Sequence, residues 1–483
     1  MGCAIRRKTQ AILHALCYLA ILDVIGCTTQ SSQSSSFPFE PFRVDLSRYE
    51  SVQKRGKPQN PELALAVAIS GGGHRAGQYG IAVLTALELV RLGESNVLQE
   101  VDYLSTASGG GFAAAIYISE LYAHTQQGKL AATFDFAQTL AEDCTLNPPD
   151  PQAGRYEGDR CLRAQIEYNY RLPLWKRITP KIIFTALTSG DALETEFDDR
   201  LLGRIRHDGK YTMTLSKMFV SRECVPVLPY WVANATVYEN GAILPLTPDV
   251  LERYNVTGWN HRMKNEEKPP GDLPLSVALK ASASFPVLIP STILRTSRTT
   301  EDRYMRLTDG GQADNLGILT ALDLLLTDPA KPPRRVLLVV DAYPGTGSPY
   351  TTSTRSALPF PVFYRAADIS LDSWRGRYRE IVASLGQQHN VRVVALPFEL
   401  AAQPADQHVP PQCQRLAEEV QRRKWDVTTE EDRRTLMDRA RGVGTDLKIS
   451  PAEREDLQRA GHVVVLRACK QIVDVITSSE SQK

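Results

Sequence analysis

Short apolar runs that end in glycine-rich turns recur in the first quarter of the chain. Residues 63–69 (LALAVAI) are apolar throughout and are followed by Ser-Gly-Gly-Gly, which is typical of a buried strand that ends in a turn. Residues 77–92 then place apolar side chains at helical spacing. Residues 101–107 and 112–121 repeat this succession of strand, glycine turn and helix. Two such units predict an α/β fold with parallel strands.

Four later segments have the length and composition of strands and extend the predicted sheet. They lie at residues 230–237, 304–308, 335–341 and 391–396. The third contains the run VLLVV, which is typical of a central strand that is buried on both faces. The pattern weakens at residues 122–190 and 345–360, where we expect loops. The sequence therefore predicts a mostly parallel central sheet.

The bulk composition excludes several classes of protein. The chain has 483 residues, 42% of them hydrophobic, and a formal net charge of +1. Proteins that bind nucleic acid usually carry a basic excess, so we expect no nucleic-acid partner. Neither a Cys/His zinc spacing nor an acidic calcium loop is present in the sequence, so we expect no metal and no cofactor. The composition does not predict the oligomeric state.

The N-terminal segment has the pattern of an export signal. Basic residues 6–8 precede an apolar run at residues 11–22, which is short for a bilayer span of about 20 residues. The run continues into the sequence VIGC, which ends at Cys27 and resembles a bacterial lipoprotein signal, in which the cysteine is lipidated. Residues 28–36 (TTQSSQSSS) are typical of a flexible tether.

We therefore expect an exported protein that Cys27 anchors to a bacterial membrane at the periplasmic face, with the outer membrane as one candidate. A soluble secreted protein cleaved near Gly26 and an uncleaved anchor helix are the alternatives. In an exported protein Cys144 and Cys161 could pair, because they bracket a loop-like insert; buried free thiols are the alternative.

The first glycine-rich turn, Gly71-Gly72-Gly73, is followed two residues later by Arg75. It matches the dinucleotide pattern GxGxxA, but the next strand ends at Ser108 and not at the acidic residue that such a site needs. A P-loop is excluded because no Gly-Lys-Ser/Thr follows. Backbone N–H groups at a helix N-terminus bind anions, including the oxyanion of a tetrahedral intermediate, and Arg75 adds positive charge.

The second turn has the pattern of a nucleophile elbow. Ser108 precedes Gly109 and Gly110, and Thr106 takes the place of the first glycine in G-x-S-x-G. Small flanking residues allow a sharp bend between strand and helix that exposes the serine Oγ. An ordinary Ser-Gly loop is the alternative.

A serine nucleophile needs a base, and the sequence points to Asp309. None of the eight histidines sits at an obvious turn after a later predicted strand, whereas Asp309 follows residues 304–308 and precedes Gly310 and Gly311. We expect it at the sheet edge where the carboxyl ends of strands gather ligands. A desolvated carboxylate held close to a hydroxyl can accept its proton. A surface Asp-Gly-Gly turn is the alternative.

Taken together and in this order, the three motifs resemble those of the patatin-like phospholipases. Residues 71–75, 106–110 and 309–311 match that family's G-G-G-x-R oxyanion loop, nucleophile elbow and D-G-[GA] base motif, and residues 278–286 and 309–318 resemble it as well. The resemblance implies a Ser–Asp dyad without histidine on a patatin-like three-layer α/β/α fold. The resemblance spans about residues 63–345. Together with the N-terminal signal and the densely charged, helically spaced C-terminal residues, it leads us to expect a signal peptide, a tether, a catalytic domain and a charged helical C-terminal extension packed on that domain, at residues 1–26, 27–60, 61–400 and 401–483.

The resemblance also implies the activity of a lipid acyl hydrolase of the phospholipase A or lysophospholipase kind. Ser108 would attack the ester, Asp309 would take its proton, and the glycine loop with Arg75 would hold the oxyanion. The expected partners are a membrane lipid as substrate and the membrane surface through the lipid anchor. An acyltransferase that uses the same acyl-enzyme and a catalytically silent lipid-binding lipoprotein are the alternatives. The head group and chain length of the lipid are not predicted.

Overall fold

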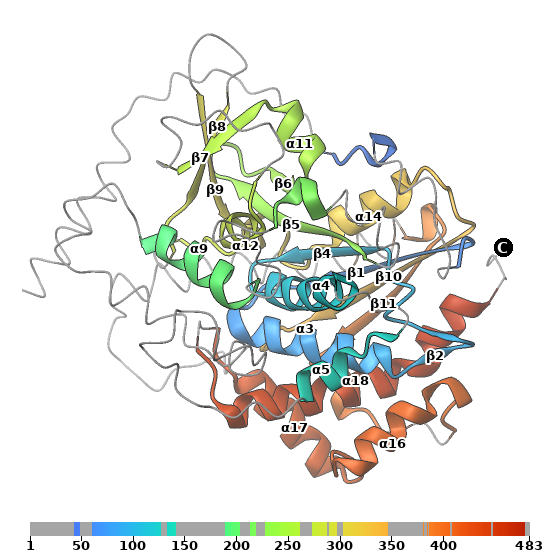
Figure 1. Ribbon diagram of the computed structural model, residues 1–483. Helices are drawn as coiled ribbons and strands as arrows, with labels where there is room; N and C mark the ends of the chain where they lie inside the picture. The colour runs from blue at the N-terminus through green and yellow to red at the C-terminus, as the bar shows by residue number, and fades with distance from the viewer. Residues whose placement is uncertain are drawn as a thin grey trace, which may run out of the picture. The chain divides into compact units, whose positions relative to one another are not determined.

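In the part of the chain that the structure describes, nine strands form one sheet (Figure 1). They are β1 (Leu63–Ile69), β4 (Tyr103–Ala107), β5 (Tyr230–Val237), β6 (Ile243–Leu246), β7 (Val256–Trp259), β8 (Thr292–Thr296), β9 (Arg303–Asp309), β10 (Arg334–Asp341) and β11 (Val391–Pro397). Their order is β11-β10-β1-β4-β5-β9-β8-β7, and β6 pairs with β5. A separate two-stranded ladder joins β2 (Arg91–Leu92) and β3 (Ser95–Asn96).

The computed structural model describes residues 43–48, 60–126, 133–141, 189–202, 213–218, 228–260, 273–286, 289–296, 303–345, 380, 384, 386–405, 408–445 and 448–478. All of these belong to one unit, Phe42–Lys483. The predicted signal peptide, Cys27 and most of the predicted tether lie outside the described residues. So do Cys144, Cys161 and nearly all of the loop expected at residues 345–360.

The sheet changes character at β5. From β11 to β5 every pair of neighbouring strands is parallel, whereas β6, β7, β8 and β9 join their neighbours in antiparallel pairs. The predicted α/β class and its central sheet are confirmed. The sheet is nevertheless mixed, because the parallel strands form only one side of it.

Helices lie on both faces of the sheet, with α3 and α18 on one side and α14 on the other (Figure 1). Among the described helices, none is long and apolar enough to cross a membrane. The helices are α3 (Gly73–Glu88), α4 (Gly110–Gln126), α5 (Phe136–Ala141), α9 (Ser189–Arg200), α11 (Pro248–Arg253), α12 (Leu275–Ser282), α13 (Gly311–Asp314), α14 (Ile318–Thr327), α16 (Gln414–Arg422), α17 (Glu430–Gly442) and α18 (Pro451–Thr477), with 3-10 turns η1 (Leu46–Arg48), η5 (Phe398–Ala402) and η6 (Pro411–Cys413).

The helix expected after the first glycine turn is present as α3, but it begins at Gly73, inside the turn itself and four residues before the helical pattern of residues 77–92. Gly72 has a φ of 140°, which a residue with a side chain rarely adopts, and this lets the chain turn from β1 directly into the helix. The N-terminus of a 16-residue helix therefore lies in the loop that was predicted to bind an anion.

The C-terminal residues pack against α3 through α18. Gly461 of α18 lies so close to α3 that a Cβ on it would be 2.5 Å from the Cβ of Ala82. The helix starts with a capping box, in which Ser450 Oγ accepts from the Glu453 N–H and the Glu453 carboxylate accepts from the Ser450 N–H. A disulfide joins Cys413 to Cys469 and so fixes the start of α16 to α18.

The Cys413–Cys469 disulfide closes a loop with a sequence separation of 56 residues. In the chain-entropy model a loop of this length stabilises the folded state by about 4 kcal/mol. We expect the double substitution Cys413→Ser and Cys469→Ser to lower the free energy of unfolding by about 2–4 kcal/mol, measured by denaturant titration. Dithiothreitol should destabilise the wild type by a similar amount, and an equal effect on the double variant would contradict the assignment to this bond.

Candidate active site

Ser108 occupies a strained turn between β4 and α4. Its φ is 49°, in the left-handed region that residues with a side chain rarely adopt. The Ser108 N–H donates to Ser282 Oγ at 2.9 Å, and the Gly111 N–H donates to the Ser108 carbonyl at 3.0 Å. The backbone conformation and the position of the turn are those expected of a nucleophile elbow.

Asp309 ends β9 and meets Ser108 across β5. The last residue of β4, Ala107, pairs with Asn234 of β5, and the next β5 residue, Ala235, pairs with Asp309. Ser108 and Asp309 therefore flank β5 at the same level. Ser108 Oγ donates a hydrogen bond to Asp309 Oδ2 at 2.6 Å.

Strand β9 brings Asp309 to this level from the direction opposite to that of β4. Strand β9 is antiparallel to β5, whereas β4 is parallel to it. Asp309 ends its own strand beside the carboxyl end of β4, at the edge where it was predicted, but β9 is an antiparallel strand of a sheet that was predicted to be mostly parallel. The two residues still meet, because β5 extends past the end of β4 and β9 pairs with that extension.

The surroundings of Asp309 raise its proton affinity. The residue is 3% exposed, and burial raises the pKa of its carboxyl to about 6. Hydrogen bonds from Ser108 Oγ and from the Gly311 N–H to Oδ1, at 2.8 Å, act in the opposite direction and lower the pKa. A carboxylate with a pKa near 6 is ionised at neutral pH and is a stronger proton acceptor than an ordinary aspartate.

The glycine loop packs directly against the elbow. A Cβ on Gly109 would lie 2.0 Å from the Gly73 carbonyl oxygen, so the two turns are in backbone contact and Gly109 does not tolerate a side chain. No described residue accepts a hydrogen bond from the N–H of Gly72 or of Gly73. These two groups, at the N-terminus of α3, are suited to stabilise a negative charge.

Gly71 differs from its two neighbours. Its N–H donates to the Asn315 carbonyl at 2.8 Å and is not free to bind an oxyanion. Its lack of a side chain is required instead, because a Cβ would lie 2.4 Å from Asn315 Oδ1 and 3.2 Å from Ser108 Cβ. The prediction of Gly71 as an oxyanion donor is corrected in this respect.

Arg75 makes two backbone contacts away from the elbow. Its guanidinium is buried and donates from Nε to the Ala342 carbonyl and from Nη1 to the Val443 carbonyl, both at 2.8 Å. Nη2 lies near Gly72, where a Cβ would be 3.0 Å away. A direct contribution of Arg75 to the oxyanion remains a prediction.

Sequence reasoning did not identify several residues that hold the pair in place. Besides Ser282, the carbonyl of Ser284 accepts from the Asp309 N–H at 3.0 Å, so the end of α12 and the residues after it contact both members of the pair. Both serines lie in residues 278–286, which only the family resemblance had singled out. Asn234 donates from Nδ2 to Ser105 Oγ at 2.9 Å and to the Thr106 carbonyl at 3.0 Å.

Thr106, which stands at the first glycine position of the elbow, has a hydrogen-bond partner for its hydroxyl. Thr106 Oγ1 accepts a hydrogen bond from Trp231 Nε1 at 2.8 Å, and both side chains are buried. The hydroxyl is therefore satisfied in the interior, as a buried polar group must be. A threonine at this position is compatible with the bend at Ser108.

A family model described as patatin-like phospholipase matches residues 67–322, which is more than half of the chain. The chain belongs to the patatin-like phospholipase family. The matched residues include the glycine loop, the elbow and the Asp309 motif of this patatin-like chain. Among curated proteins no significant match was found.

The patatin-like chain is also similar to solved structures of human GIVD cytosolic phospholipase A2. One has a TM-score of 0.39 and 10% identity, and covers 90% of this chain and 65% of that chain. A complex with methyl gamma-linolenyl fluorophosphonate inhibitor and terbium chloride has a TM-score of 0.39 and 12% identity, covering 90% and 64%. The chain thus spans about 65% of the length of these neighbours.

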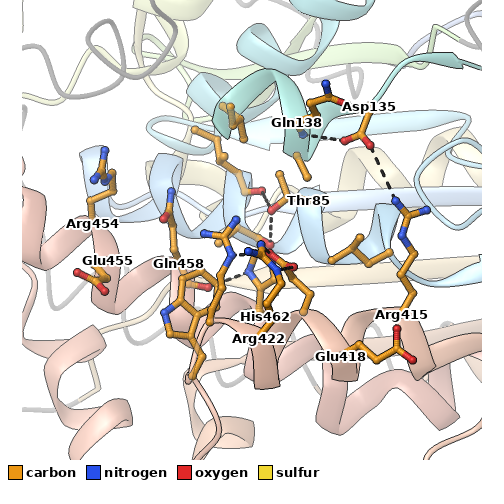
Figure 2. Close-up of a pocket in the computed structure, with 18 of the residues that line it drawn as sticks. Thr85, Asp135, Gln138, Arg415, Glu418, Arg422, Arg454, Glu455, Gln458 and His462 are labelled. Carbon is orange, nitrogen blue, oxygen red and sulfur yellow. Dashed lines mark hydrogen bonds and ion pairs between the residues drawn. The ribbon is translucent and has the colours of Figure 1, made fainter. Parts of the chain in front are cut away.

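A pocket of about 640 Å³ between α3, α5, α16 and α18 is separate from this site (Figure 2). Its lining residues include none from the glycine loop, the elbow or the Asp309 motif. Many of its charged groups pair with each other: Arg415 lies 3.9 Å from Asp135, and Glu419 accepts from Arg422 and Arg423. The patatin-like motifs therefore do not open into this pocket.

The raised pKa of Asp309 predicts a pH-dependent stability. Because the pKa is higher in the folded protein than the ordinary value of 3.8, this contribution to stability is present below about pH 4 and is lost as pH rises through about 6. We expect Asp309→Asn to gain stability relative to the wild type between pH 4 and pH 8, by about 3 kcal/mol, measured by denaturant titration at each pH.

Ser108→Ala provides the matched comparison. It removes a hydrogen bond that lowers the pKa of Asp309, so the pH at which stability is lost should move above 6. A stability difference between Asp309→Asn and the wild type that stays constant with pH would contradict the raised pKa.

Proposed function

We propose that the chain hydrolyses acyl esters of lipids, with Ser108 as nucleophile and Asp309 as base. The observation that carries the proposal is the 2.6 Å hydrogen bond from Ser108 Oγ to a buried carboxylate whose pKa is raised to about 6. A nucleophilic serine next to a base of suitable pKa is the arrangement required for acyl transfer. Membership of the patatin-like phospholipase family supports a lipid as the substrate.

In the first half of the reaction, Asp309 accepts the proton of Ser108 Oγ as this oxygen bonds to the ester carbonyl carbon. The carbonyl oxygen becomes an oxyanion, which the N–H groups of Gly72 and Gly73 stabilise. The carbon–oxygen bond of the ester then breaks. The leaving alcohol takes the proton from Asp309, and the acyl group remains on Ser108.

In the second half, water attacks the acyl-enzyme and gives its proton to Asp309. The bond between the acyl carbon and Ser108 Oγ breaks, and the proton returns to Ser108 as the fatty acid leaves. Asp309 thus acts as base and as acid in each half, so no histidine is required.

We further propose that Cys27 anchors the enzyme by lipid to a bacterial membrane, on the periplasmic side. The sequence around Cys27 supports this, and so does the Cys413–Cys469 disulfide, since disulfides persist in oxidising compartments. An anchored enzyme would meet its lipid substrate at the surface to which it is tethered. Mass spectrometry of the mature N-terminus tests this part: an unmodified Cys27 would contradict it.

The catalytic assignment is tested by Ser108→Ala and Asp309→Asn with a p-nitrophenyl ester and with phospholipid vesicles. We expect Ser108→Ala to abolish hydrolysis and labelling by a fluorophosphonate probe, and Asp309→Asn to lower kcat by about 100- to 10,000-fold. Ser119→Ala changes a buried serine and Asp323→Asn changes a partly buried carboxylate, both outside the site, and both variants should retain activity. Wild-type rates in both dyad variants would refute the assignment.

The pH dependence provides an independent test. Only ionised Asp309 can accept the serine proton, so kcat/KM should rise with pH and level off above a midpoint of about 6. The rate of fluorophosphonate labelling should follow the same curve. A profile that is flat between pH 4 and 8 would exclude Asp309 as the base.

A further inference from the structure

Ala342, the residue that follows β10, makes hydrogen bonds with both ends of the glycine loop. Ser70, just before the loop, accepts the Ala342 N–H on its Oγ at 2.9 Å. Arg75, just after the loop, donates from Nε to the Ala342 carbonyl at 2.8 Å. Hydrogen bonds to Ala342 therefore hold the loop at both ends, and Arg75 makes one of these bonds.

The same guanidinium also makes a hydrogen bond to the C-terminal part of the chain. Arg75 Nη1 donates to the carbonyl of Val443, which follows α17 and is 368 residues away in the sequence. Arg75 is only 4% exposed, so water does not compete appreciably for these bonds. Hydrogen bonds from a charged donor are stronger than those between neutral groups.

Val443 is itself held by the elements around it. Arg441, two residues earlier, donates from Nη2 to Glu399 Oε1 at 2.7 Å, and its guanidinium lies against Gly345, where a Cβ would be 3.3 Å away. Tyr79 of α3 donates to the Leu396 carbonyl at 2.9 Å. Figure 1 shows α18 running along α3, and the C-terminal helices thus support the helix that begins in the glycine loop.

We propose that residues 391–478, which lie beyond the part matched by the family model, set the geometry of the glycine loop through Arg75. This rests on the proposed function of that loop. Arg75 is then a positioning residue and not an oxyanion donor. Its planar fork of N–H groups can hold two carbonyls at once, which the point charge of a lysine cannot do with the same geometry.

The proposal predicts a specific kinetic effect. The glycine loop acts on a charge that exists only during the reaction, so a displaced loop lowers kcat and leaves KM nearly unchanged. The pH midpoint should stay near 6, because no contact of Asp309 changes. General destabilisation of the protein would not produce this combination.

The kinetic test compares Arg75→Lys and Arg75→Ala with Arg459→Ala in the full-length protein on a p-nitrophenyl ester. Arg459 also donates to two carbonyls, of Trp425 and Asp426, but does not contact the loop. We expect both Arg75 variants to lose about 10- to 1000-fold in kcat, as for a lost oxyanion donor, and Arg459→Ala to keep the wild-type rate. Recovery of kcat in Arg75→Lys would overturn the proposal, because it would show that the positive charge alone is needed.

Hydrogen exchange followed by mass spectrometry tests the attachment without any activity. Arg75→Ala should increase exchange both at residues 70–76 and at residues 441–445, whereas Arg459→Ala should increase neither. Gly461→Leu, which forces α18 away from Ala82 of α3, should also increase exchange at residues 70–76. Unchanged exchange at residues 441–445 in Arg75→Ala would overturn the proposal.

The two tests separate the possible failures. A wild-type protein without esterase activity would contradict the proposed function, while the exchange experiment would still decide whether Arg75 links the loop to the C-terminal helices. An active protein whose Arg75→Ala variant keeps its kcat would contradict only the inference.

Discussion

The hydrogen bond between Ser108 and Asp309 depends on how β5 pairs on its two sides. On one side the parallel strand β4 ends level with Asn234, and on the other the antiparallel strand β9 ends level with Ala235. A shift of one residue in either register would move a side chain to the opposite face of the sheet. The 2.6 Å distance is therefore a property of the sheet and not of the two turns alone.

The close approach of the glycine loop to the elbow is the second constraint. With the Gly109 backbone in contact with Gly73, the N-terminus of α3 lies beside the serine, and the free N–H groups of Gly72 and Gly73 are placed without any side chain. The elbow holds Ser108 at a positive φ, and burial keeps the pKa of Asp309 raised. Both features are unfavourable for stability, and strain of this kind is typical of sites built for a reaction.

The sequence predicted the elements that a short run of neighbouring residues is enough to mark. The strands at residues 63–69 and 230–237 have the bounds predicted, because uniform apolar runs there end in turns. The direction of β9 was not predictable, because the alternation of residues along a strand carries no information about the direction of its neighbours. The start of α3 was missed because glycines usually mark a turn, and here they also form the first residue of a helix.

The contacts that sequence reasoning missed join segments far apart in the chain. Arg75 binds carbonyls 267 and 368 residues away, and any residue can supply a carbonyl, so no side-chain pattern marks these partners. The sequence shows that Cys413 and Cys469 are cysteines and could form disulfides. That they pair with each other follows only from the packing of α16 against α18. The motif residues were recognisable, whereas the residues that hold them in position were not.

The bond between Ser108 and Asp309 joins residues 201 positions apart, across the boundary between the parallel and antiparallel parts of the sheet. Contacts of such high sequence separation form only after long stretches of chain have been ordered, at a large cost in conformational entropy. A chain in which only one part of the sheet has formed contains the serine without its partner carboxylate. Because Asp309 comes next to Ser108 only when β9 pairs with β5, the proposed lipid hydrolysis would require both parts of the sheet to be formed.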